Sequence, residues 1–356
     1  MGPLVFGFRF LGRLGLETHK CCFPANQLEL HQFSQNLLQQ PFHTSPLENE
    51  ISGKLIHKAK RVVEMSNNYK LIVVGATGYI GKSLYADFIT NSTVYGTSSA
   101  GADGLLCLQL NAPNDFDYEI IQPSDAVLLT AAISAPDVCA REHGRAWAVN
   151  VTGTSEFIAR VMARGGRVIF FSSDTVYGER GDEFDERAAC NPAGEYAAMK
   201  HEVEKRFLGD PLFKAIRLSY VFSRDDKFTK YLSRCSERGE EADIFHPFYR
   251  AVIYRDDVVA GAIALTQRWD EFSQSTINFG GPEVLTRTEF GEILRDTALP
   301  NLRFRVSEPD AGFFKNRPRV IRMASPILAS LLGRPAHTLR EAAKIEFDLK
   351  EENIHD

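Results

Sequence analysis

The chain has 356 residues, of which 44% are hydrophobic, and its formal net charge at pH 7 is −5. This length and apolar content can bury a full core in one large domain or two intertwined domains. The acidic balance provides no overall basic field to hold nucleic acid or an anionic membrane, so neither is an expected partner. No stretch approaches the roughly 18 apolar residues that a membrane span needs.

The first 64 residues are rich in Gln, Leu, His and Phe but show no sustained periodicity. We expect residues 1–64 to be a poorly ordered leader or an upstream extension outside the fold. Arg9 and Arg13 interrupt the apolar start, which argues against a secretory signal peptide. Met65 begins a segment that runs directly into the first expected strand, so an extended gene model is favoured over a targeting peptide.

From Tyr69 onward, short apolar runs alternate with segments of helical periodicity. The expected strands are residues 71–75, 92–98, 125–132, 166–173 and 213–222. The expected helices are residues 80–89, 145–165 and 195–208. This alternation predicts the α/β class, with a doubly wound parallel sheet of the Rossmann type.

The pattern breaks into shorter pieces after residue 222. A helix is expected near 227–238, and mixed segments follow at 246–265 and 278–297. We therefore predict an NAD(P)-binding Rossmann domain at 65–222. Residues 223–356 are expected to form mainly a smaller mixed α/β substrate-binding lobe, intertwined with that domain.

The cysteines are scattered along the chain: Cys21, Cys22, Cys107, Cys139, Cys190 and Cys235. They form no C-x-x-C pair and have no His at metal-ligand spacing in the sequence. This usage indicates reduced thiols in a cytoplasmic protein and predicts no metal site.

Residues 75–83, GATGYIGKS, allow two interpretations of one phosphate-binding loop. Gly75, Gly78 and Gly81 fit a dinucleotide-binding turn, whereas Gly81-Lys82-Ser83 resembles the end of a Walker A loop. Both loops follow a strand and open a helix, so both present backbone N–H groups to phosphate. The loop by itself does not decide between hydride chemistry and phosphoryl transfer.

Tyr196 and Lys200 form a Tyr-x-x-x-Lys pair on an expected helix, and Ser173 lies at the end of an expected strand. The i, i+4 spacing places the phenol and the ammonium on one helix face. A neighbouring cation favours the phenolate and lowers the pKa of a tyrosine, which suits proton transfer near neutrality. Together with the glycine turn, this combination favours hydride chemistry over the Walker interpretation.

The segments GATGYIG, AWAVNVTGT, FFSSDTVYG, YAAMK, VIYRDDVV and NFGGPEVLTRTEF occur in this order between about residues 70 and 300. In these motifs the sequence resembles the extended short-chain dehydrogenase/reductases that act on nucleotide sugars. Within that superfamily it is most similar to dTDP-4-dehydrorhamnose reductases, whose Ser-Thr-Asp strand end is here Ser172-Ser173-Asp174.

The resemblance implies a role for each motif residue. Tyr196 would be the general acid, Lys200 would bind the nicotinamide ribose and keep the pKa of the tyrosine low, and Ser173 would hydrogen-bond the substrate oxygen. The implied cofactor-binding residues are Gly75, Thr77, Gly78, Tyr79, Ile80, Gly81, Thr97, Ser98, Ala131, Ala132, Asn150 and Lys200. The implied substrate-binding residues are Ser173, Asp174 and Arg250. Of these, Arg250 would meet the nucleotide diphosphate, Asp174 would be an orienting residue or a loop cap, and Asn150 would shape the site.

The second expected strand ends at Tyr95-Gly96-Thr97-Ser98-Ser99 without the acid that usually binds the ribose 2′-hydroxyl of NAD. Ala100 follows, so an arginine clamp for a 2′-phosphate is missing as well. NADP(H) is therefore the preferred cofactor, with NAD(H) as the alternative.

The expected function is NADP(H)-dependent reduction of a keto nucleotide sugar, of the 4-keto-6-deoxy type, for deoxysugar or surface-polysaccharide biosynthesis. A 4,6-dehydratase would need a second acid where Thr175 follows Asp174. The alternatives are an epimerase with tightly bound NAD and a non-catalytic regulatory relative, although the latter would be expected to have lost the Tyr or the Lys. The sequence leaves both a monomer and a homodimer open.

Overall fold

The computed structural model describes residues 69–88, 93–101, 103–179, 182–310 and 312–349. The chain separates into two units, Met1–Asn68 and Tyr69–Asp356, and the description below concerns the second. The leader predicted at 1–64 lies outside the described residues.

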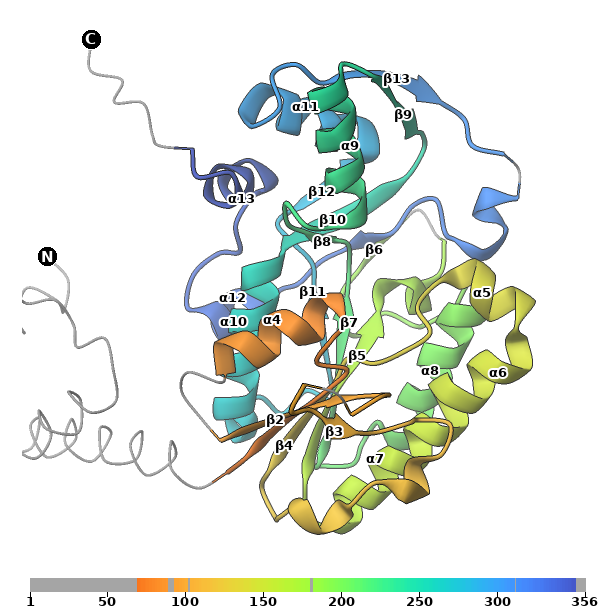
Figure 1. The fold of residues 1–356 in the computed structure, drawn as a ribbon, viewed down its shortest axis with the longest axis vertical. Helices are drawn as coiled ribbons and strands as arrows, with labels where there is room; N and C mark the ends of the chain where they lie inside the picture. Colours follow the sequence, from red (N-terminus) through yellow and green to blue (C-terminus); the bar gives the residue numbers. More distant parts are fainter. Residues whose placement is uncertain (1–68, 89–92, 102, 180–181, 311, 350–356) are drawn as a thin grey trace, which may run out of the picture. The chain divides into compact units, whose positions relative to one another are not determined.

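Seven parallel strands form the central sheet (Figure 1). They are β1 (Leu71–Val74), β2 (Val94–Ser98), β3 (Leu106–Cys107), β4 (Ala126–Leu129), β5 (Arg167–Ser173), β7 (Phe213–Leu218) and β11 (Thr276–Phe279). The spatial order is β3-β2-β1-β4-β5-β7-β11, so the chain winds outward in both directions from β1. The predicted α/β class with a doubly wound parallel sheet is confirmed.

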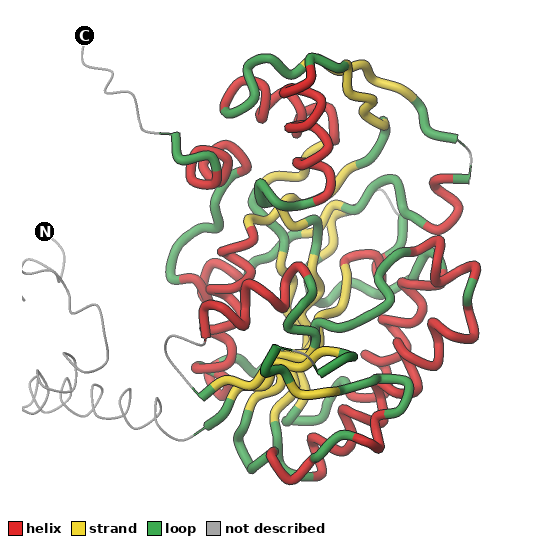
Figure 2. The backbone as a smooth tube through the Cα atoms, in the orientation of Figure 1, coloured by secondary structure: helices red, strands yellow, loops and turns green. Residues whose placement is uncertain are grey.

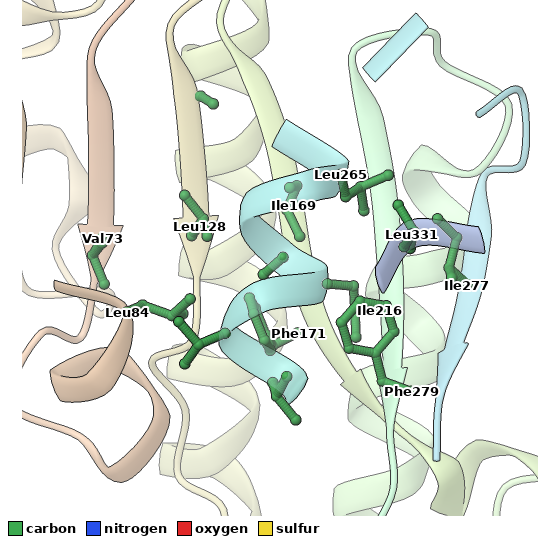
Figure 3. Close-up of a cluster of buried hydrophobic side chains, with 14 of the residues drawn as sticks. Val73, Leu84, Leu128, Ile169, Phe171, Ile216, Leu265, Ile277, Phe279 and Leu331 are labelled. Carbon is green, nitrogen blue, oxygen red and sulfur yellow. The ribbon is translucent and has the colours of Figure 1, made fainter. Parts of the chain in front are cut away.

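Helices cover both faces of this sheet, which explains why its central strands β1 and β4 are buried and apolar throughout. One face carries α4 (Tyr79–Phe88), α10 (Arg255–Gln267) and α12 (Leu328–Leu332), and the other carries α7 (Thr154–Ala163) and α8 (Glu195–Phe207). Figure 3 shows the first of these two cores, in which Val73 and Leu128 of the sheet pack with Leu84 and Leu265 of the helices. The alternate side chains Ile72 and Val74 belong to the core on the opposite face.

The second part of the chain builds a lobe at the carboxyl ends of these strands (Figures 1 and 2). Its helices are α9 (Lys227–Arg238), α11 (Arg287–Thr297) and α13 (Leu339–Glu346). Its strands are β8 (Val221–Phe222), β9 (Glu241–Phe245), β10 (Tyr249–Tyr254), β12 (Glu283–Thr286) and β13 (Arg303–Ser307). They form the small sheets β12-β10-β8 and β13-β9, and a further pair joins β6 (Glu183–Phe184) to β14 (Arg322–Met323). The lobe has its own buried core, rich in aromatic side chains.

Two expected elements differ from the prediction. The helix expected at 145–165 is divided into α6 (His143–Trp147), a π-helical segment (Ala148–Gly153) and α7, with α5 (Pro136–Arg141) before them. At Gly153 a Cβ would lie only 1.4 Å from the Leu110 carbonyl oxygen, so glycine allows this close approach. The strand expected at 213–222 is divided between β7 of the main sheet and β8 of the lobe.

No helix within the described residues combines the length and the apolar character that crossing a membrane would require.

Candidate active site

The glycine turn joins β1 to α4. Gly75 has a φ of +87°, which glycine adopts without strain, and the Gly78 N–H donates to its carbonyl oxygen at 2.9 Å. A Cβ on Gly81 would lie 2.1 Å from that same oxygen. Only glycine therefore lets the first turn of α4 approach the end of β1. The turn has the geometry that brings backbone N–H groups and a helix start to a pyrophosphate.

Lys82 lies on the exposed side of α4, and its N–H donates to the Gly78 carbonyl as an ordinary first-turn helix bond. Among the described residues that line the cavity beside the turn, neither Lys82 nor Ser83 is included. The two residues that suggested a Walker loop are therefore not placed to hold a phosphate there.

A cavity of about 610 Å³ opens beside the glycine turn. Its walls include most of the residues that the sequence predicted for the cofactor site: Gly75, Thr77, Gly78, Tyr79, Ile80, Gly81, Thr97, Ser98, Ala131, Ala132 and Lys200. Tyr196 lines the same space. The structure thus brings the glycine turn between β1 and α4 close to the Tyr-x-x-x-Lys helix α8. These two segments are more than a hundred residues apart in sequence.

Lys200 is buried at the floor of this cavity, on α8. Its ammonium donates a hydrogen bond to the Phe171 carbonyl oxygen at 2.7 Å and lies 4.5 Å from the centre of the Phe170 ring. Burial lowers the pKa of Lys200 to about 8, although the nearby Glu204 carboxylate opposes this change. The ammonium is therefore held in place by the backbone of β5.

Tyr196 lies one turn before Lys200 on the same helix, and the ammonium is 5.8 Å from the centre of its ring. Burial raises the pKa of the Tyr196 phenol, and Cys139 and Asp174 raise it further. The expected lowering of this pKa by Lys200 is thus not present in the structure, because burial dominates and the ammonium is directed at Phe171. A phenol in this state is protonated at neutral pH.

Ser173 ends β5, and the hydroxyl is fully engaged with its neighbours. Its oxygen accepts hydrogen bonds from Thr175 N at 3.2 Å and Thr175 Oγ1 at 2.9 Å, while its proton is directed to Asp174 Oδ1 at 3.2 Å. Asp174 is buried, accepts a second bond from Ser219 Oγ at 2.8 Å, and has a pKa raised by burial. The choice for Asp174 between an orienting residue and a loop cap stays a prediction.

Arg250 is placed differently from the expectation of a diphosphate contact. Its Nη1 donates to the Tyr249 carbonyl at 2.6 Å, its Nη2 donates to the Pro318 carbonyl at 2.7 Å, and its Nε lies 3.6 Å from Asp174 Oδ2. The side chain is buried, and burial lowers the pKa of its guanidinium. The guanidinium therefore connects the lobe to Asp174 and would have to give up these contacts to bind a phosphate.

Asn150 lies in the π-helical segment and binds the backbone that follows β4. Its Oδ1 accepts from Ile133 N at 2.8 Å, and its Nδ2 donates to Ile133 O at 2.9 Å. Asn150 thus holds the backbone at Ile133, which lines the cavity together with Ala131 and Ala132. The shaping role of Asn150 stays a prediction. Asn150 itself is not among the described residues that line the cavity.

The sequence reasoning missed several polar residues of the cavity wall, namely Ser99, Gln109, Asn111, Ser134 and Arg145. Ser134 could have been found, because it follows β4 and loops at the carboxyl ends of parallel strands gather ligands. Gln109 and Asn111 follow β3, which is only two residues long and gives no recognisable strand pattern.

The doubly wound sheet, the glycine turn after its first strand and the Tyr-x-x-x-Lys helix at one cavity define the extended short-chain dehydrogenase/reductase class. Residues 69–343 match the family model described as the RmlD substrate binding domain, and the chain belongs to this family.

Three known proteins illustrate these relationships. Methionine adenosyltransferase 2 subunit beta of Danio rerio is 26% identical over 265 residues, which cover 70% of this chain and 81% of that protein. The structure of MoeE5 in complex with UDP-glucose and NAD has a TM-score of 0.66 at 20% identity, covering 78% of this chain and 97% of that one. A dTDP-4-dehydrorhamnose reductase, an RfbD ortholog from Clostridium acetobutylicum, has a TM-score of 0.65 at 20% identity, covering 79% and 99%. The two structural matches support the fold.

Proposed function

We propose that this protein reduces a keto group of a nucleotide sugar, of the 4-keto-6-deoxy type, with NADP(H), in the synthesis of a deoxysugar or a surface polysaccharide. The observation that carries the proposal is the single cavity of about 610 Å³ shared by the glycine turn, Tyr196 and Lys200. Family membership supports it, and the solved structures named above come from proteins of the same fold.

In this reaction the glycine turn, Tyr196, Lys200 and Ser173 have separate roles. When bound, the nicotinamide cofactor supplies the hydride. The backbone at the start of α4, where the glycines allow close approach, would hold its pyrophosphate. The Tyr196 phenol, which is protonated at neutral pH because burial raises its pKa, gives its proton to the substrate carbonyl oxygen. The Lys200 ammonium, after it turns from the Phe171 carbonyl toward Tyr196, stabilises the phenolate that forms. Ser173 donates a hydrogen bond to the same oxygen after its hydroxyl turns away from Asp174.

The cofactor preference follows from the end of β2. Thr97, Ser98 and Ser99 line the cavity there, and the described lining residues include no carboxylate that would repel a 2′-phosphate. The structure of MoeE5 contains NAD, but this observation concerns the cofactor of MoeE5 and not that of the present chain. Titrating the purified chain with NADPH and NADH tests the preference, and we expect tighter binding of NADPH. Tighter binding of NADH would reverse the assignment.

The reaction is tested by incubating the protein with NADPH and a panel of 4-keto-6-deoxy nucleotide sugars while following the loss of NADPH absorbance. We expect oxidation with at least one member of the panel. No oxidation with any of them, together with NAD recovered from the purified protein, would favour the epimerase alternative.

A second candidate is a regulatory subunit, and the names of the sequence relatives favour it. The sequence relative described above from Danio rerio is named as a subunit of methionine adenosyltransferase 2. The test is to add the chain to a methionine adenosyltransferase catalytic subunit and measure complex formation and the catalytic rate. This candidate would be supported over the reductase by two results together. The parent protein would show no reductase activity, and the Tyr196→Phe variant would still change the rate of the catalytic subunit.

A further inference from the structure

Cys190, His201 and Glu204 come together behind the candidate active site. Their thiol, ring-nitrogen and carboxylate ligand atoms all lie within 4.8 Å of one another. Cys190 is in the segment between β6 and α8, whereas His201 and Glu204 lie on α8 itself. This group is not visible in the sequence, because a lone cysteine and a distant histidine fit no metal-ligand spacing.

The helix brings two of these residues to one face. His201 and Glu204 are three positions apart on α8, a spacing at which side chains are neighbours. His201 Nδ1 lies 3.8 Å from Glu204 Oε2, which is too far for a hydrogen bond. Helical pairs of this type supply two ligands to one ion in metal sites of helix bundles.

Two buried polar atoms at this place have no hydrogen-bond partner among the described residues. They are His201 Nδ1 and Ser172 Oγ, and both side chains lie close enough to the Glu204 carboxylate to lower its pKa. Buried polar atoms without a partner are rare, and a common reason is a missing water or ion. The two atoms therefore lack a hydrogen bond of ordinary geometry that a water or an ion beside this carboxylate could supply.

The carboxylate is already held in position from its other side. Arg217 Nη2 donates to Glu204 Oε2 at 2.7 Å, and Arg217 Nε lies 3.3 Å from Oε1. Ligating carboxylates are characteristically hydrogen-bonded by an outer residue in this way. Each carboxylate oxygen has a second lone pair, so the arginine contact leaves one available for an ion.

We propose that Cys190, His201 and Glu204 bind a Zn²⁺ ion, with a water as the fourth ligand. A thiolate, an imidazole nitrogen and a carboxylate oxygen are the ligand types that zinc selects. Zinc bonds of about 2.0–2.3 Å in a tetrahedron place ligand atoms roughly 3.5 Å apart, so the observed group needs to contract only slightly. On binding, the Cys190 thiol loses its proton to solvent and the thiolate takes the metal.

The ion would join the segment before α8 to α8 itself. This helix carries Tyr196 and Lys200 to the cavity, so the ion would fix the segment that leads into the catalytic helix. The His201 side chain is 22% exposed, which gives the ion a path from solvent. The inference does not depend on the reaction that the protein catalyses.

The experiment titrates the metal-free full-length protein with Zn²⁺ by calorimetry and, in parallel, with Co²⁺ by absorbance. We expect one equivalent of Zn²⁺ to bind and to raise the melting temperature. Co²⁺ should give a thiolate-to-metal charge-transfer band and the visible bands of tetrahedral coordination, both displaced by Zn²⁺.

Cys190→Ser should abolish the charge-transfer band, and His201→Gln should weaken Zn²⁺ binding by more than about tenfold, since even outer residues of metal sites are worth 10–100-fold. The matched controls are Cys107→Ser and His143→Gln, an exposed cysteine and an exposed histidine outside the group. Melting curves of all four variants without metal show whether each one folds. A band that is absent from the parent protein, or that survives in folded Cys190→Ser, would overturn the proposal and leave a buried water at this place.

Discussion

The glycine-turn side and the lobe side of the candidate active site differ in how much open space and how many unoccupied groups they offer to a ligand. Beside the glycine turn, the segment from Thr77 to Gly81 lines an open cavity of about 610 Å³. On the lobe side, Arg250 and Arg287 lie around a space of only about 10 Å³. The Arg287 guanidinium is stacked against Phe228 and Phe248, at 4.4 and 4.8 Å from the ring centres. The cofactor side is thus preformed, whereas the charges of the lobe side are occupied by internal contacts.

This difference has an energetic basis. A glycine turn offers backbone groups that need no rearrangement, so a ligand meets them at little conformational cost. A buried guanidinium that binds carbonyl groups must first lose those bonds, and a ligand can displace them only by offering stronger ones. Substitutions on the two sides should therefore have different consequences for binding, rate and stability.

The largest effect is expected where the two sides meet, at Tyr196. Tyr196→Phe removes the proton donor, so turnover of the keto sugar should fall by about 10²–10⁴-fold, while the affinity for NADPH is retained. Steady-state kinetics and a cofactor titration measure the two quantities. Tyr95→Phe, which alters an exposed phenol, is the control. A variant at position 196 that keeps its rate would show that the phenol is not the acid.

On the lobe side, Arg250→Leu should cost stability. It leaves the Asp174 carboxylate and the Pro318 carbonyl buried without their partner, and we expect the free energy of unfolding to fall by about 3–5 kcal/mol. Urea unfolding measures this change. Adding Asp174→Asn to the variant should recover part of the loss.

Arg305→Leu is the matched control for the lobe, because Arg305 pairs with Asp243 at 3.4 Å on the surface, where its side chain is 67% exposed. An exposed pair of this kind is worth at most about 1 kcal/mol. Equal losses at positions 250 and 305 would mean that the buried contacts of Arg250 contribute little.

On the cofactor side, Gly81→Ala tests the close approach of α4 to β1. The added methyl would meet the Gly75 carbonyl at 2.1 Å, so the turn must shift. We expect a loss of about 1–3 kcal/mol in unfolding free energy and weaker NADPH binding. Gly144→Ala is the control, since Gly144 is also helical but a Cβ added there would have no atom within 4 Å. It should stabilise the protein by about 0.5–1 kcal/mol. Equal changes in the free energy of unfolding for Gly81→Ala and Gly144→Ala would contradict the importance of the close approach at Gly81.

The smallest effect is expected at Lys82. Because its side chain is exposed on α4, Lys82→Ala should change stability by less than about 0.5 kcal/mol and leave NADPH turnover intact. A large loss of activity in this variant would bring back the phosphoryl-transfer interpretation of GATGYIGKS.

The glycine turn and the Tyr-x-x-x-Lys helix could be predicted because each is a local pattern at a strand end or on one helix face. The two-sided burial of β1 was likewise visible as a continuous apolar run. The contacts of Arg250 could not be predicted, because Pro318 and Arg319, whose carbonyls it binds, lie 68 and 69 positions away in sequence. The π-helical segment was equally hidden, and so was the close approach of Gly153 to the Leu110 carbonyl, which joins positions distant in sequence. The assigned roles of Ser173, Tyr196 and Lys200 stay predictions.

The outermost strand of the main sheet, β11, pairs with β7 although the whole of α9, β10 and α10 separates them in the chain. During synthesis on the ribosome, β7 therefore has no partner strand at this edge until residue 279 has emerged. A fragment that stops at residue 222 would present that edge, with its unpaired N–H and carbonyl groups, to other chains. Exchanging the lobe for that of a relative would therefore require separate grafts before β11, after β11 and, for α13, beyond α12, rather than one cut.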